Sequence, residues 1–269
     1  MMMKRKLFIL LAFLCVLSAP AMAQDSEKQA VCMDQVVSTN PKDAAMAERL
    51  RSAIVSYLTS LGRVTLVDAK TLGTLPEAAN ERVKALGQKG FAYVLGASLD
   101  NVTYATENNI AAMLSYTVRL TNARTGEVAY SRSFQKSGHA GNAEEAMQKV
   151  IEDVNKDITS FANDVFPAIG TVKAIDKMDK NEVATEVYVN LGSDQGIAVG
   201  NQLDVYQRMY IGGEPVWNKV TELKVIRLVG GNMSLCKCTA GGRKIKPAMD
   251  SEQLLRVINH GAQTRFWND

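Results

Sequence analysis

The chain has 269 residues, 46% of them apolar and 22% charged. Since single domains commonly hold roughly 100–200 residues, this length predicts about two domains. The composition is that of a globular protein and argues against a disordered chain or a polytopic membrane protein. The formal net charge of +3 comes from three basic residues among the first 23, and the remainder balances 28 basic against 28 acidic residues. Nucleic-acid binding through bulk positive charge is therefore not expected.

The first 23 residues have the pattern of a secretory signal peptide. Basic residues 4–6 precede an apolar run over residues 7–17, and the sequence AMA at residues 21–23 fits the small-x-small rule for cleavage before Gln24. As a helix this run spans about 16 Å, too little for a hydrocarbon core of about 30 Å. Cys15 lies inside the run without the small residues that lipoprotein processing needs. We expect an exported, soluble periplasmic protein, at most peripheral to the membrane.

Residues 24–167 have the hydrophobic periodicity of an α/β domain, in the order strand, helix, strand, helix, three strands, helix. Asn40 and Pro41 predict a helix start, and Gly62 and Gly87 predict the ends of the first two helices. The expected strands cover residues 31–37, 64–67, 92–103, 110–122 and 128–134, and the later helices residues 77–86 and 143–165.

Two stretches of this region carry a family resemblance. The strand GFAYVLGASL at residues 90–99 and the hairpin VRLTNARTGEV at residues 118–128 resemble motifs of the curli-secretion-channel (CsgG-like) family and of the related lipoprotein activator of penicillin-binding proteins. The resemblance covers most of residues 30–165 and implies an α/β domain of the cell envelope. Curli-type pores also have a lipidated cysteine and membrane-inserting hairpins. Here the interval 101–109 is too short for two strands of about 9–11 residues each, so a pore is not expected.

From residue 168 onward the sequence changes to short β segments separated by glycines, which predicts a small all-β barrel or sandwich. The expected strands cover residues 170–175, 184–190, 202–207, 221–228 and 233–239. We therefore predict an α+β chain, with a two-layer or three-layer α/β domain on a mixed sheet followed by the β domain. The expected divisions are a signal peptide at 1–23, the α/β domain at 24–167, the β domain at 168–250, and a strand or helix with a polar tail at 251–269.

The second region has its own resemblance. The turn NLGSDQGIAVGN at residues 190–201 resembles the C-terminal β domain of flagellar assembly protein T. The match continues through residues 213–216, 222–225, 234–238 and 242–250, where it ends in a predicted turn. The resemblance implies a β-barrel module joined to an α/β domain in one periplasmic chain. The glycine-rich turn lacks the Gly-Lys-Ser/Thr ending of a phosphate loop, so no nucleotide or other cofactor is expected.

Three cysteines remain after signal cleavage: Cys32, Cys236 and Cys238. Their odd number leaves at least one thiol outside any intramolecular disulfide, and whether the others pair is left open. Cys236 and Cys238 are two apart on a predicted strand and point to one face. No second pair or histidine cluster completes four metal ligands, so buried thiols are the favoured interpretation.

Residues for catalysis do not form a recognisable pattern. His139 is predicted in a surface loop and His260 in the polar tail, and neither has an acidic partner at a spacing that indicates a proton relay. The adjacent carboxylates at 144–145 and 152–153 diverge on their helix by about 100°. We therefore expect a protein that is not an enzyme, with no catalytic, cofactor-binding or metal-binding residues to name.

The favoured hypothesis is a non-catalytic accessory or scaffold protein of the bacterial cell envelope. It would bind envelope proteins through the sheet of the α/β domain and through the β domain, with peptidoglycan or another wall polymer as a further candidate partner. The alternative is a glycan or small-ligand binding protein that uses Trp217, which is predicted on a polar loop after Pro215. The sequence leaves the oligomeric state and the pathway open.

Overall fold

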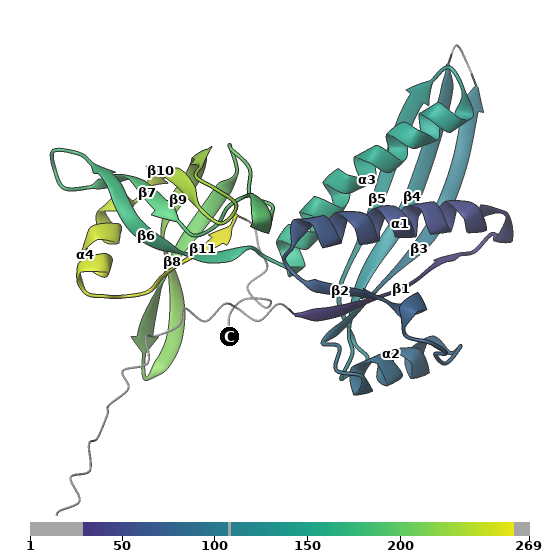
Figure 1. Cartoon of the computed structure of the whole chain (residues 1–269), viewed down its shortest axis with the longest axis horizontal. Coiled ribbons are helices and arrows are strands. Elements are labelled where there is room, and N and C mark those ends of the chain that lie inside the picture. Colours follow the sequence, from purple (N-terminus) through teal and green to yellow (C-terminus); the bar gives the residue numbers. More distant parts are fainter. Residues whose placement is uncertain (1–28, 107–108, 261–269) are drawn as a thin grey trace, which may run out of the picture.

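The computed structural model describes residues 29–106 and 109–260, so the predicted signal peptide and residues 261–269 of the polar tail lie outside the described residues. The described part contains a five-stranded sheet in the order β2-β1-β3-β4-β5 and a closed barrel in the order β10-β7-β6-β11-β8-β9 (Figure 1). The predicted α+β class is confirmed, and the second region is a barrel rather than a sandwich.

The first sheet is mixed. β1 pairs in parallel with β2 and β3, whereas β4 is antiparallel to both β3 and β5. Its strands are β1 (Ala30–Ser38), β2 (Thr65–Asp68), β3 (Tyr93–Thr106), β4 (Ile110–Asn122) and β5 (Val128–Ala140). β5 is longer than predicted, so His139 lies on a strand and not in a loop.

Helices cover this sheet unequally. α1 (Ala44–Leu61) and α3 (Ala143–Val165) pack on one face, where Leu50, Tyr116 and Phe161 belong to the main core. α2 (Ala79–Gln88) lies on the other face over Cys32 and neighbouring apolar residues. Among the described residues, the sheet therefore has helices on both faces beside α2 and on one face only toward β5 (Figure 1).

The helix ends agree only in part with the sequence. Asn40 caps a 3-10 turn at Pro41–Asp43 directly before α1, and Gly62 ends α1 in the left-handed conformation at φ 63°. Gly87 does not end its helix. It lies within α2 without a positive φ, and the first residue with a positive φ after the helix is Gly90, at 94°. Glycine at position 87 instead permits close packing, because a Cβ there would come 2.2 Å from the carbonyl oxygen of Ala123.

The barrel encloses a second core of aliphatic side chains such as Val187, Leu203 and Val257. Its strands are β6 (Ile169–Met178), β7 (Ala184–Val189), β8 (Gln202–Ile211), β9 (Glu214–Leu228), β10 (Ser234–Ala240) and β11 (Leu255–Asn259). The predicted turn at residues 242–250 is instead a 3-10 turn followed by the short helix α4 (Ile245–Asp250), which seals the core with Ile245 and Ala248. No helix in the described ranges is long and apolar enough to cross a membrane.

Two side chains join the sheet region to the barrel. The guanidinium of Arg63 donates to the backbone oxygen of Gln195 at 2.9 Å and to Oδ1 of Asn163 at 2.7 Å. Asn259 accepts from the backbone N–H of Ala168 at 2.7 Å and donates to the backbone oxygen of Asn163 at 3.2 Å. These contacts form a polar joint between the end of α3 and the barrel.

Candidate functional site

The most exposed apolar structure in the described residues is a hairpin that extends from the barrel. β11 pairs with β8 only as far as Gln207, and β10 pairs with β9 only from Glu222 onward. Between these points β8 and β9 pair only with each other, and Figure 1 shows their ends leaving the barrel as a ribbon. We call residues 208–217 the arm.

The turn of the arm determines which backbone groups face outward. Gly212 and Gly213 have φ of 62° and 92°, as a two-residue type I′ turn requires. The turn bonds the carbonyl of Ile211 to the N–H of Glu214, so these two residues form a hydrogen-bonded pair. Because bonded and non-bonded pairs alternate in an antiparallel ladder, the next pair, Tyr210 and Pro215, is not hydrogen-bonded.

Apolar side chains cover both faces of the arm. Tyr210 is 66% exposed and Ile211 62%, and Met209 and Val216 are each 40% exposed. The guanidinium of Arg208 lies 5.5 Å from the ring centre of Tyr210. Contiguous exposed apolar surface of this kind marks interaction sites, so the arm is the leading candidate for a contact surface.

Trp217 lies at the base of the arm. The prediction that it sits on a loop is wrong, because it belongs to β9 and pairs with Arg208 across the ribbon. The guanidinium carbon of Arg256 lies 4.0 Å from the centre of the indole ring, a cation–π contact that occupies one face of the ring. A sugar could stack only on the other face, and the role of Trp217 in glycan binding stays a prediction.

The outer edge of β5 is a second candidate surface. This strand has 13 residues and, within the described ranges, pairs only with β4. Its two cations turn toward α3, where Arg132 binds Asp164 at 3.0 Å and Lys136 binds Asp157 at 2.8 Å. The opposite face carries the small or uncharged side chains Ser131, Ser133, Gln135 and Ser137. Charged side chains commonly protect an edge strand against pairing with another chain, but both cations of β5 are instead paired with carboxylates of α3.

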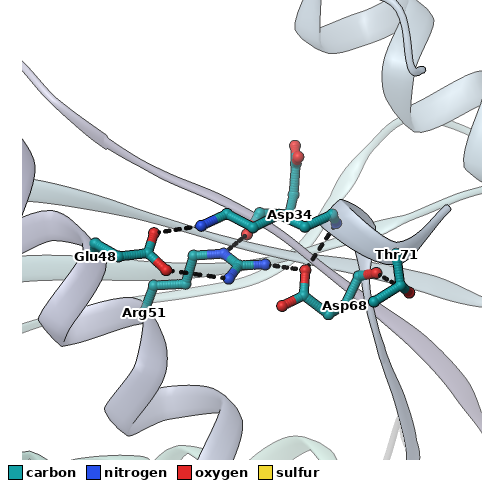
Figure 2. A network of polar contacts seen from close by, with 6 residues as sticks. Asp34, Glu48, Arg51, Asp68 and Thr71 are labelled. Carbon is teal, nitrogen blue, oxygen red and sulfur yellow. Dashed lines mark hydrogen bonds and ion pairs between the residues drawn. The ribbon is translucent and has the colours of Figure 1, made fainter. Parts of the chain in front are cut away.

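A network of ion pairs lies at the carboxyl end of β2, beside the point where β1 stops pairing with it (Figure 2). The guanidinium of Arg51, 4% exposed, donates to the backbone oxygen of Asp34 at 3.3 Å and to the carboxylate of Asp68. It also lies 3.6 Å from Glu48, which binds Lys70 at 2.7 Å. The hydrogen bond from Arg51 holds the pKa of Asp68 below its ordinary value.

A surface cavity of about 350 Å³ opens beside this network. Such crevices at the carboxyl ends of parallel strands are common ligand sites in α/β folds. Here the second arginine at the cavity, Arg82, already binds Asp34 at 2.9 Å and the backbone oxygens of Pro76 and Glu77. Since both guanidinium groups are engaged by the chain itself, the network ties α1, α2 and two strands together and offers no free cation to a ligand.

The two histidines differ in their surroundings. His139 is exposed on β5, whereas Nδ1 of His260 lies 3.0 Å from Asp204, which also binds Lys219 at 2.8 Å. The His260–Asp204 contact joins residues 56 apart, so no local spacing could reveal it. In the described part of the chain, no group of three or more histidine, cysteine or acidic side chains is arranged to hold a metal ion.

Cys32, Cys236 and Cys238 are all free thiols. Cys236 is buried in the barrel core, and Cys238 packs against that core from the same side of β10. Burial raises the pKa of each of the three thiols to about 11, so they are protonated at neutral pH. The interpretation as a buried thiol holds for Cys236, whereas Cys238 is half-buried, and in the described residues no disulfide joins any of the three.

No family model and no curated protein matches this chain. The solved structures that match include a PelC dodecamer from Paraburkholderia phytofirmans, with 16% identity over 49% of this chain and 87% of that chain and a TM-score of 0.37. Lipoprotein GNA1162 from Neisseria meningitidis matches with 16% identity over 49% and 99% of the two chains, at 0.35. The LpoB C-terminal domain from Escherichia coli matches with 20% identity over 45% and 88%, at 0.27. At these scores the matches carry no argument about function.

Proposed function

We propose that this chain is a non-catalytic accessory protein of the bacterial cell envelope that acts by protein–protein contact. The arm is the observation that carries the proposal. An isolated two-stranded ribbon is marginally stable in water, and this one also exposes Tyr210 and Ile211 by more than half. A partner that covers the arm would remove both disadvantages, because it would bury the apolar side chains and extend the sheet.

The polar clusters support the same proposal. Each charged group in the network around Arg51 and Arg82 is paired within the chain. Asp204 binds both His260 and Lys219. These arrangements are typical of ion pairs that hold a fold together, since catalytic groups need a free acid, base or nucleophile directed at a substrate.

Export and domain division are parts of the proposal. The signal pattern before Gln24 and the resemblances to curli-type and flagellar assembly proteins favour the periplasm. We propose residues 24–167 and the barrel as separate domains, because each region has its own sheet and its own apolar core. The barrel domain extends beyond the expected end at residue 250, because β11 (Leu255–Asn259) lies between β6 and β8 and closes the barrel.

Photo-crosslinking in intact cells tests the proposed function. A photoreactive phenylalanine analogue replaces Ile211 at the tip of the arm, and illumination should produce a specific adduct with an envelope protein. The matched control is the same analogue at Val199, which is equally exposed at 61% but lies outside the arm. This control should give no adduct, because exposure alone does not select a partner.

Two results would count against this proposal. Absence of an adduct both at Ile211 and at Ser133 on the β5 edge would leave neither candidate surface with a protein partner. Retention of the chain on purified peptidoglycan, abolished by Trp217→Ala, would instead favour the glycan-binding alternative.

A further inference from the structure

The two edges of the arm are not equivalent. Tyr210 and Pro215 face each other at a non-hydrogen-bonded position, so the backbone nitrogen of each points outward. Proline has no N–H, and Pro215 therefore blocks the outer edge of β9 against an added strand. On β8, Tyr210 and the next non-bonded residue, Arg208, both direct an N–H and a C=O outward. In the described ranges no other strand pairs with β8 beyond Gln207.

The chemistry of this edge determines what can cover it. The bilayer interior cannot satisfy the outward N–H and C=O groups, and open sheet edges do not occur there. Glu214 also stands next to the turn, where insertion would bury its charge. An extended polypeptide supplies the missing hydrogen bonds and covers the apolar side chains at the same time. A protein strand is therefore the fitting occupant of the β8 edge.

We propose that this strand is β8 of a second copy of the same chain, paired antiparallel about a two-fold axis at Met209. The inference rests on the proposed function, since it names a partner for the same arm. In this register Arg208 of each copy lies opposite Tyr210 of the other, and their outward backbone groups form two hydrogen-bonded pairs. Met209 faces its symmetry mate at the non-bonded position on the axis.

Side-chain chemistry favours this register. Arg208 already lies over Tyr210 within one chain, and the pairing places each guanidinium beside an aromatic ring of the second copy as well. Like charges do not face each other, because arginine is opposite tyrosine. Two marginal ribbons become a four-stranded sheet with Met209, Ile211 and Val216 from both copies on one face. Three or more strands with an apolar face are what independent stability requires.

Sedimentation velocity over a concentration series tests the pairing, on the full chain that starts at Gln24. The wild type should dimerise reversibly. Tyr210→Pro removes the outward N–H on β8 just as Pro215 does on β9, and it leaves the β8–β9 ladder intact because position 210 does not bond across the ribbon. We expect at least a tenfold weaker dimer. The control Tyr210→Phe keeps both the ring and the N–H and should dimerise like the wild type, with circular dichroism showing that both variants are folded.

Each other outcome overturns the inference. A wild type that stays monomeric at all concentrations excludes self-pairing; if Ile211 still crosslinks to another envelope protein, the proposed function stands without it. A Tyr210→Pro variant that dimerises as well as Tyr210→Phe places any dimer contact elsewhere, such as the β5 edge. Binding to vesicles of phosphatidylethanolamine and phosphatidylglycerol, with a blue shift of the Trp217 fluorescence in a Trp267→Phe background, shows that lipid covers the arm.

Discussion

At the scale of single residues, Arg51 shows how this chain keeps a buried charge. Its guanidinium is held by oxygens of Asp34, Glu48 and Asp68, which come from β1, α1 and the end of β2. A buried cation tolerates loss of such a partner poorly, because removing one side of the pair leaves the other without compensation. Asp68 is therefore the residue at which the network can be tested.

We expect Asp68→Asn to lower the free energy of unfolding by about 1.5–3 kcal/mol, the usual range for a hydrogen bond to a charged group. Arg51 lowers the pKa of Asp68, so the contribution of this pair is present above the ordinary carboxyl pKa of about 3.9 and is lost as pH falls through the lowered value. Urea unfolding at neutral pH and near pH 3 measures both effects. The difference between variant and wild type should shrink in acid.

The exposed pair between Asp153 and Lys156 provides the control. Asp153→Asn should leave unfolding unchanged at both pH values, because exposed ion pairs contribute little. If both substitutions changed the free energy of unfolding equally, the Arg51 network would contribute no more to stability than an exposed ion pair does.

At the scale of elements, the packing of α2 depends on a missing side chain. Gly87 lets the helix approach the turn after β4, where a Cβ would lie 2.2 Å from the oxygen of Ala123. Alanine ordinarily stabilises a helix by about 1 kcal/mol relative to glycine. Here we expect Gly87→Ala to destabilise the chain by about 1–3 kcal/mol, as overpacking does, and thermal unfolding measures it.

Gly96 on β3 is the matched control. A Cβ at this position meets nothing within 4 Å, and its φ is not positive. Gly96→Ala should therefore be neutral or slightly stabilising, because alanine restricts the unfolded chain. If Gly87→Ala also raised the melting temperature, the close approach of α2 to Ala123 would be wrong.

Local pattern predicted the elements whose two sides differ in burial. α3 has the bounds predicted from its apolar stripe. The stripe is clear because one side of this helix packs on the sheet and the other side is exposed to solvent. The ends of β8 and β9 were missed, since both faces of the arm are exposed and no alternation arises. The Gly212-Gly213 pair is a hairpin signal that would have revealed it. Gly87 was misread because its role depends on Ala123, a tertiary contact that no local signal records.

At the scale of the whole molecule, the joint depends on Arg63. Its guanidinium donates to backbone or amide oxygens of Gln195, Asn163 and Phe166, and no ion pair with a carboxylate is found for it in the described residues. Burial lowers its pKa to about 10, so it remains charged at neutral pH. A charge satisfied only by neutral oxygens from α3 and the barrel favours one arrangement of the two regions, because any displacement would leave it uncompensated.

Arg63→Ala tests both the joint and the proposed domain division. Loss of hydrogen bonds from this half-buried cation should weaken the coupling by about 2 kcal/mol. If residues 24–167 and the barrel through β11 fold separately, calorimetry should show one transition for the wild type and two for the variant, with faster proteolysis near Pro167. The exposed turn residue Arg124 supplies the control Arg124→Ala, which should match the wild type. A single, unshifted transition in Arg63→Ala would mean that the two cores unfold together without this residue.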